Sequence, residues 1–222
     1  MNSPKRSNRP EVTDVKRKSG GLRSIETSGG RKYLVVKRAE TEYLLQAGTP
    51  LKESDIRMLD NDLAREAGMR MASEKLSRRA RSEGEIRSSL RKEGVENKEV
   101  IDYIIETLKK HRYLDDREFA RNYIEYRLKY RPTGPGMIKK KLLRVYVSRE
   151  VAEEALEQCF DIGTERELAE SMIRGRFRPS ENLKRLVGRV NGFLRRRGFS
   201  SEITNSICSR ILRKEFFGDH YE

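Results

Sequence analysis

The sequence predicts an all-α fold of tandem three-helix repeats in an elongated array, preceded by a short β-rich segment. The first observation is an internal repeat, because the segments 85–95, 137–147 and 189–199 align at a constant spacing of 52 residues. The second is that their shared apolar positions recur four residues apart, on one face of a helix. The third is a thin apolar supply, with 35% hydrophobic against 38% charged residues, which suits several small cores.

Composition narrows the expected partner and compartment. The net charge of +14 favours a polyanion, either nucleic acid or an acidic protein surface. Two cysteines, Cys159 and Cys208, are too few for a disulfide framework and suit a reducing compartment. No apolar run approaches the roughly 20 residues that span a membrane, and the basic N-terminus lacks the apolar core of a secretory signal. We therefore expect a cytoplasmic protein, with a monomer as the default state.

The N-terminal part divides into two segments. Residues 1–21 are polar, basic and rich in Ser, Pro and Gly, which predicts a disordered tail. This tail is either a mobile hook for a polyanion or a solubilising segment. Residues 22–52 are predicted to be β-rich, because Gly29 and Gly30 form a hairpin signal and the stretches 33–36 and 43–45 favour strands. Such a small meander must pack against the rest of the chain to be stable.

The remaining chain is predicted to form three helical repeats, 53–111, 112–160 and 161–222. Each contains three helices, expected at 60–80, 82–93 and 97–111, then at 115–130, 134–145 and 148–160, and then at 164–177, 180–197 and 200–215. The middle helices share two apolar positions, occupied by Ile86, Ile138 and Val190 and by Leu90, Leu142 and Leu194. A unit of this size has a very small core, so stacking on its neighbours should supply much of the stability.

Residues at the ends of these helices fit the assignment. Gly94 and Gly198 are stop signals after the first and third middle helices, where the chain needs a left-handed residue. Tyr146 occupies the same position in the second repeat, so a weaker cap is expected there. The last helix of each repeat should begin after an N-cap residue, and the candidates are Asn97, Ser148 and Ser200.

The adjacent carboxylates Asp115 and Asp116 raise the question of catalysis, and helix capping explains them. With Asp115 as N-cap, Glu118 completes a capping box and Leu114 and Phe119 form a hydrophobic staple. The charge of Asp116 then lies at the positive end of the helix dipole. The same capping logic predicts boxes that pair Ser82 with Glu85 and Thr164 with Glu167.

Sequence patterns typical of enzymes are missing. The two histidines, His111 and His220, have no Cys or His at metal-ligand spacing, and a two-metal nuclease would need several converging carboxylates. The stretch 134–136 lacks the lysine of a phosphate loop and reads as a helix entry with Pro135 at the first position. We therefore expect no enzymatic activity, no metal and no cofactor.

Positive charge is concentrated on the predicted middle helices. Because their apolar stripes face the core, the charged side chains are expected to point outward and to align into a basic strip when the repeats stack. Simple solubility of basic helices is the alternative. The residues predicted to form this binding surface are Arg87, Arg91, Lys92, Lys139, Lys140, Lys141, Arg144, Arg195, Arg196 and Arg197.

Several of these stretches carry a family likeness. The run "YLDDREFA" at 113–120, then "RPTGPGMIKKKL" at 131–142 and the helix "SREVAEEALE" together resemble the RecX regulatory proteins, which are bacterial modulators of the RecA recombinase. The resemblance covers roughly residues 22–215. Its most specific part is the signature formed by Tyr113, Leu114, Asp115, Asp116, Phe119 and Ala120.

The resemblance implies a curved, elongated array without enzymatic activity that negatively regulates RecA. Its implied partners are RecA and the RecA filament on single-stranded DNA, with duplex DNA as a further ligand left open. The implied effect is inhibition of ATP hydrolysis, strand exchange and co-protease activity, and so modulation of recombination, DNA repair and the SOS response. The alternative is a helix-turn-helix-like DNA-binding regulator that acts without RecA. The acidic third helix of the second repeat argues against that alternative.

Overall fold

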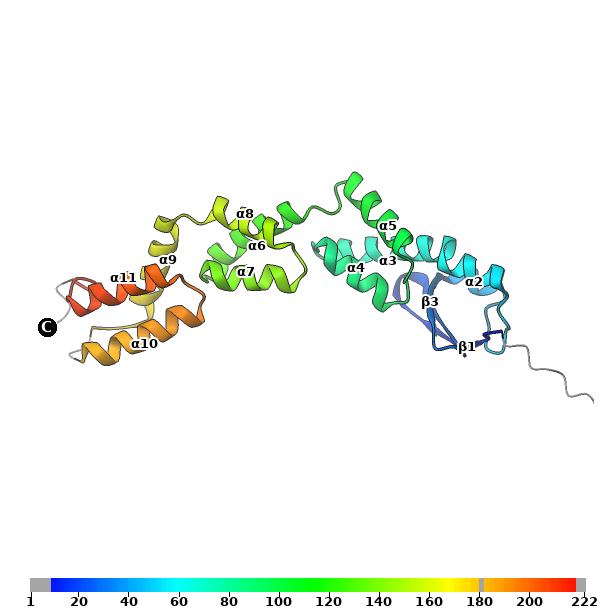
Figure 1. Ribbon diagram of the computed structural model, residues 1–222, viewed down its shortest axis with the longest axis horizontal. Coiled ribbons are helices and arrows are strands. Elements are labelled where there is room, and N and C mark those ends of the chain that lie inside the picture. The colour runs from blue at the N-terminus through cyan, green and yellow to red at the C-terminus, as the bar shows by residue number, and fades with distance from the viewer. Residues whose placement is uncertain (1–8, 180–181, 219–222) are drawn as a thin grey trace, which may run out of the picture. The chain divides into compact units, whose positions relative to one another are not determined.

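The computed structural model describes residues 9–179 and 182–218, which fall into two compact units, 1–115 and 116–222 (Figure 1). The first unit holds a three-stranded antiparallel sheet and the first helical repeat. The second unit holds the other two repeats. Helices dominate both, as the sequence predicts. The expected disorder of residues 1–8 concerns residues outside those described.

The sheet is formed by β1 (Val12–Arg17), β2 (Leu22–Thr27) and β3 (Lys32–Val36), in that order. A short 3₁₀ turn, η1 (Ser19–Gly21), connects the first two strands. Ile25 lies at the centre of the sheet and pairs with Val15 on one side and Tyr33 on the other. Strands β2 and β3 occupy the predicted positions, with the turn between them at Gly29 and Gly30.

Two details of the N-terminal prediction are wrong. Strand β1 lies within the stretch predicted to be a disordered tail; it is an edge strand with one neighbour, and three of its six side chains are charged. The predicted strand around Tyr43 is absent, since residues 37–42 form helix α1 (Lys37–Glu42). This helix is held by the buried Ala39 and by an ion pair between Glu40 and Arg23 at 2.6 Å.

The first helical repeat covers the sheet. It comprises α2 (Glu53–Asp60), α3 (Asp62–Arg78), α4 (Glu83–Lys92) and α5 (Lys98–Lys110). Helix α3 packs against β3 and also against α5, so the sheet and the repeat share one core. Gly68 on α3 permits this close approach, because a Cβ there would lie 2.7 Å from the side chain of Ile104.

The second unit contains two smaller cores. The second repeat is α6 (Asp116–Tyr130), α7 (Pro135–Arg144) and α8 (Arg149–Cys159), and the third is α9 (Ile162–Arg176), α10 (Leu183–Arg196) and α11 (Ser201–Leu212). Each repeat encloses its own cluster of buried apolar residues. The middle helices contribute the predicted pairs to these clusters, including Ile138 and Leu142 in the second repeat.

The predicted helix ends are confirmed for the middle helices. Gly94, Tyr146 and Gly198 all adopt left-handed backbone conformations, with φ of 98°, 63° and 80°. In each repeat the amide of the next residue donates to the carbonyl at the equivalent position of the middle helix, as from Val147 to Leu142 at 3.1 Å. Tyr146 therefore takes the position that the other repeats give to glycine, at the cost of a conformation that side chains disfavour.

The predicted helix beginnings are mostly confirmed. The side chains of Asn97, Ser148 and Ser200 accept bonds from amides of the helices they precede, and Ser82 and Glu85 form the predicted capping box. The box at Thr164 is wrong, because α9 begins earlier, with Asp161 as its N-cap, and the amide of Thr164 donates to it. Helix α6 begins at Asp116, as expected if Asp115 is its N-cap.

The second and third repeats meet through a backbone contact at Gly134. The amide of Gly134 donates to the carbonyl of Arg197, and the amide of Gly136 donates to the carbonyl of Gly198, both at 2.9 Å. A Cβ added at Gly134 would lie 2.4 Å from the carbonyl carbon of Gly198 and the amide nitrogen of Phe199. The stretch 134–136 is therefore the predicted helix entry and also the joint between two repeats.

Candidate polyanion-binding surface

The described residues offer no catalytic constellation. Among them no group of three or more His, Cys, Asp or Glu side chains could hold a metal ion. Burial raises the pKa of the Cys159 and Cys208 thiols, which favours the protonated form over the nucleophilic thiolate. Within the same residues no helix has the length and apolar character needed to cross a membrane.

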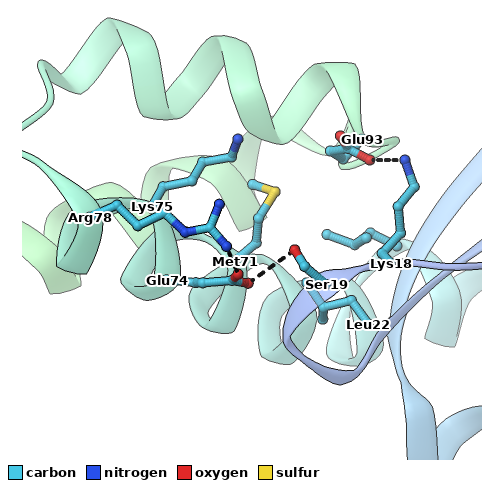
Figure 2. Close-up of a pocket in the computed structure, with 9 residues that line it drawn as sticks. Lys18, Ser19, Leu22, Met71, Glu74, Lys75, Arg78 and Glu93 are labelled. Carbon is cyan, nitrogen blue, oxygen red and sulfur yellow. Dashed lines mark hydrogen bonds and ion pairs between the residues drawn. The ribbon is translucent and has the colours of Figure 1, made fainter.

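The small pocket shown in Figure 2 is a structural joint. It has a volume of about 80 Å³ and lies where the turn η1 meets α3. Its charged groups face one another: Lys18 pairs with Glu93 at 2.9 Å, while Glu74 accepts bonds from Ser19 and Arg78. Because these charges largely neutralise each other, the pocket offers a ligand little net charge. The same contacts hold the turn η1 against the helices.

Two of the residues predicted to form the basic strip lie in ion pairs within their own repeat. Arg87 on α4 contacts Asp102 on α5 at 2.5 Å and Glu83 at 2.7 Å, and Lys139 on α7 pairs with Glu153 on α8. These pairs occupy corresponding positions in the two repeats. The prediction that such side chains point freely outward is wrong for Arg87 and Lys139, because they connect the second and third helices.

The ion pairs change the titration of their carboxyl groups. The hydrogen bond from Arg87 lowers the pKa of Asp102. Partial burial acts to raise the pKa of Glu83, but hydrogen bonds from Lys109 and Arg87 outweigh it and lower this pKa as well. In the third repeat the corresponding positions are Asn191 and Asn205, so this charge pair does not occur there.

The other predicted residues are exposed. Arg91 and Lys92 lie at the end of α4, Lys140, Lys141 and Arg144 lie on α7, and Arg195, Arg196 and Arg197 lie at the end of α10. None of these eight forms an ion pair with another residue in the described part of the chain. The helices differ in balance, because α4 has three basic residues and two carboxylates, whereas α7 has four and α10 five basic residues without any carboxylate.

Exposed tyrosines are a further feature of the described surface, and they were not predicted from the sequence as binding residues. Of the eight tyrosines in the described residues six are exposed, whereas no phenylalanine is. Tyr126 and Tyr130 on α6 are 49% and 61% exposed, their ring centroids are 5.3 Å apart, and the ammonium of Lys129 lies over Tyr130. Their spacing of four residues was the available signal. Aromatic rings beside uncompensated cations can stack on bases.

The signature residues are mainly structural. Leu114 is buried in the core of the first unit, Ala120 is buried in the core of the second repeat, and Phe119 packs against that core. Asp115 and Asp116 lie where α6 begins. Tyr113 is 68% exposed.

Comparison with known proteins assigns these repeats to a family. Residues 115–156 match the family described as "RecX, second three-helix domain". The chain is 30% identical over 182 residues to the regulatory protein RecX of Listeria monocytogenes strain EGD-e, covering 81% of this chain and 67% of the relative. The chain belongs to the RecX family. It is also 36% identical to the Geobacillus thermodenitrificans RecX over 131 residues, covering 58% of this chain and 48% of that protein.

Solved RecX structures have the same fold. A crystal structure of regulatory protein RecX covers 90% of this chain and 99% of its own, with a TM-score of 0.58 and 22% identity. RecX from Lactobacillus salivarius covers 68% of this chain, with a TM-score of 0.56. The chain spans about two thirds or less of the length of the curated RecX relatives that it matches. Its membership indicates a regulatory role, in agreement with the sequence prediction.

Proposed function

We propose that this RecX-family chain negatively regulates RecA in the cytoplasm. It binds RecA and the RecA filament on single-stranded DNA, and it inhibits ATP hydrolysis, strand exchange and co-protease activity. The chain acts without enzymatic turnover and as a monomer. Family membership together with exposed, uncompensated cations on the middle helices of the second unit carries the proposal.

The helix α7 gives this proposal its physical basis. Lys140, Lys141 and Arg144 are exposed, and α7 contains no carboxylate that could neutralise them. A filament on single-stranded DNA presents phosphates and acidic side chains, and exposed cations attract both. Lys139 is left out of this surface because Glu153 neutralises it.

Recognition of duplex DNA in the manner of a helix-turn-helix protein fits less well. In that mode the last helix of a three-helix unit enters the major groove and contacts base edges. The last helix of the second repeat, α8, carries Glu150, Glu153, Glu154 and Glu157. Glu153 and Glu154 are paired with Lys139 and Arg117, so Glu150 and Glu157 are the carboxylates that would repel the phosphates beside the groove.

The test is the DNA-dependent ATPase of RecA, measured with increasing amounts of the full chain on single-stranded DNA. We expect the rate to fall at or below one chain per RecA protomer. An unchanged rate, together with no co-sedimentation with RecA–DNA filaments, would exclude the proposed function.

Two variants that differ in whether the replaced cations have ion-pair partners test the role of α7. Replacing Lys140, Lys141 and Arg144 with Gln should weaken filament association. The slope of log affinity against log salt should become shallower by about two, because three phosphate contacts are lost. The control is Lys139→Gln, which removes a cation of the same helix that already has a partner. Equal losses for each charge removed in the two variants would show that α7 acts only through net charge.

A further inference from the structure

The third repeat holds two clusters in which arginines stack on phenylalanines, and they differ in how their charge is balanced. In the first cluster Arg174 and Arg210 lie over Phe216, with guanidinium carbons 4.8 Å and 5.4 Å from the ring centroid. Glu170 forms ion pairs with both arginines. This first cluster is therefore a partly neutralised connection between α9, α11 and the C-terminal segment.

The second cluster is built on Phe177 and Phe193, whose rings meet edge to face with centroids 5.6 Å apart. Arg176 and Arg197 lie over Phe193 at 5.2 Å and 5.4 Å, and Arg189 lies over Phe177 at 5.4 Å. Three guanidinium groups from the end of α9, the middle of α10 and the end of α10 are thus gathered around one pair of buried rings. We call these three residues the arginine triad.

The charge of the arginine triad is uncompensated. Arg176, Arg189 and Arg197 are all exposed, and none of them forms an ion pair with another described residue. Phe177 and Phe193 are buried, so they provide a rigid base for the three side chains. Helix α10 itself carries no carboxylate. Three like charges held together without a counter-charge repel one another, so an anion would relieve a cost that the fold itself maintains.

Stacking prepares these arginines for phosphate. A guanidinium that lies on an aromatic ring uses its face, and its N–H groups remain directed outward along its edge. The side chain has also lost part of its rotational freedom before any ligand arrives. Phosphate oxygens accept paired N–H bonds from this edge, a geometry that a lysine ammonium cannot provide.

We propose that the arginine triad is a binding site for the phosphodiester backbone of single-stranded nucleic acid. This site would add a DNA contact in the third repeat to the proposed function. It rests on the proposed function only for its biological setting. An acidic protein surface is the competing ligand.

Two features of the third repeat favour nucleic acid. Cations run along the whole of α10 without an intervening carboxylate, which suits a ligand that repeats the same charge at regular intervals. A depression of about 480 Å³ also opens beside the triad, lined by Phe177 and Phe217 and by Arg174, Arg178 and Pro179. The exposed guanidinium group of Arg178 at this depression can contact a base whose phosphate lies on the triad.

The test is fluorescence anisotropy of the full chain with a labelled oligothymidylate of about 30 nucleotides, without RecA, at several salt concentrations between about 50 and 200 mM. Replacing Arg176, Arg189 and Arg197 with Gln should lower the affinity about tenfold or more at the lowest salt. The slope of log affinity against log salt should become shallower by about two, since each contact on a single strand contributes about 0.7. An unchanged slope and affinity would overturn the proposal.

Two further variants guard against loss of folding. The single change Arg189→Gln should reduce the slope by about 0.7 with little effect on the fold. Replacing all three arginines with Lys keeps the charge, so the slope should stay while the affinity falls through loss of the stacked, paired geometry. If the lysine variant binds as tightly as the wild type, the triad is not a shaped phosphate site.

A control of equal charge separates this site from net charge. Arg17, Lys37 and Lys110 are exposed residues of the first unit that form no ion pair among the described residues, and replacing them with Gln also removes three positive charges. A control that loses as much affinity as the triad variant would overturn the proposal. Polyglutamate that competes as well as unlabelled oligothymidylate would assign the site to acidic proteins instead. RecA ATPase is measured in parallel, and wild-type chain that binds DNA but leaves this rate unchanged would exclude the proposed function alone.

Discussion

Replacing Gly134 with Ala should destabilise the second unit, although the backbone at this residue suits alanine. Gly134 has φ of −67° and ψ of 160°, an extended conformation that any residue adopts. On conformational grounds alone the change would be stabilising by about 0.4–1 kcal/mol, because alanine restricts the unfolded chain. The sign of the measured effect therefore reports on the surroundings of this residue.

The surroundings leave no room for a methyl group. A Cβ at Gly134 would lie 2.4 Å from the backbone of Gly198 and Phe199, which cannot move aside like a flexible side chain. Separation of the two segments would break the bonds from Gly134 to Arg197 and from Gly136 to Gly198. At about 1 kcal/mol for each hydrogen bond, we expect a net loss of about 1–2 kcal/mol, with more if packing between the repeats is also lost.

Thermal and urea denaturation followed by circular dichroism provide the assay. For a unit of about 100 residues this loss lowers the Tm by about 4–16 °C. Hydrogen exchange adds a local readout, because the amides of Gly134 and Gly136 should lose protection before those in the centre of α7. These amides report directly on the joint between the repeats.

The control is Gly188→Ala on α10, where an added Cβ would meet nothing within 4 Å. An exposed helix interior gains about 1 kcal/mol when alanine replaces glycine, so this variant should be more stable than the wild type. If Gly134→Ala is stabilised to the same extent, the close contact between the second and third repeats does not exist.

Three further predictions concern helix ends and ion pairs. Tyr146→Gly should raise the stability by about 0.5–1 kcal/mol in urea denaturation, because it removes a left-handed strain from an exposed side chain; a loss would show that the ring makes stabilising contacts. Asp115→Ala should lower the stability by about 1 kcal/mol through loss of the cap while the DNA affinity of the folded chain is kept, and an unchanged Tm with lost binding would contradict the capping assignment. Arg87→Gln should be less stable than the wild type near neutral pH, and the difference should shrink as the pH falls below about 4, because the effect of Asp102 and Glu83 is lost only when the pH passes their lowered pKa values; a difference that stays constant down to that range would refute it.

The helices were predictable because their signals are local. Apolar spacing, caps and stop residues lie within a few positions of each element, and the repeat supplies three copies of the same evidence. Strand β1 was not predictable in this way. Its pairing with β2 depends on backbone bonds to residues about ten positions away, while its own side chains resemble those of a solvated tail. The segment after β3 became α1 because Ala39 and Glu40 find partners in the folded unit.

The site was less predictable than the fold. Sequence shows where cations occur, but it does not show which of them a carboxylate neutralises. Arg87 and Asp102 are 15 residues apart, and Lys139 and Glu153 are 14 apart. Comparison of the repeats could have found these pairs, since both members recur at corresponding positions. The arginine triad had no such signal, because its residues come from two helices that meet only in the folded repeat.

The net charge of this chain therefore does not measure the charge that is available for binding a ligand. The excess of +14 belongs to the whole sequence, yet Arg87 and Lys139 form ion pairs between helices, and Glu170 partly neutralises Arg174 and Arg210. On α7 and α10 the unpaired cations also have no carboxylate on their own helix. Salt dependence of binding should follow these unbalanced residues rather than the number of basic residues per helix. Variants should therefore be chosen by whether the replaced cation has an ion-pair partner. Comparing the salt dependence of binding between paired and unpaired positions separates the effect of net charge from that of the charge available for binding.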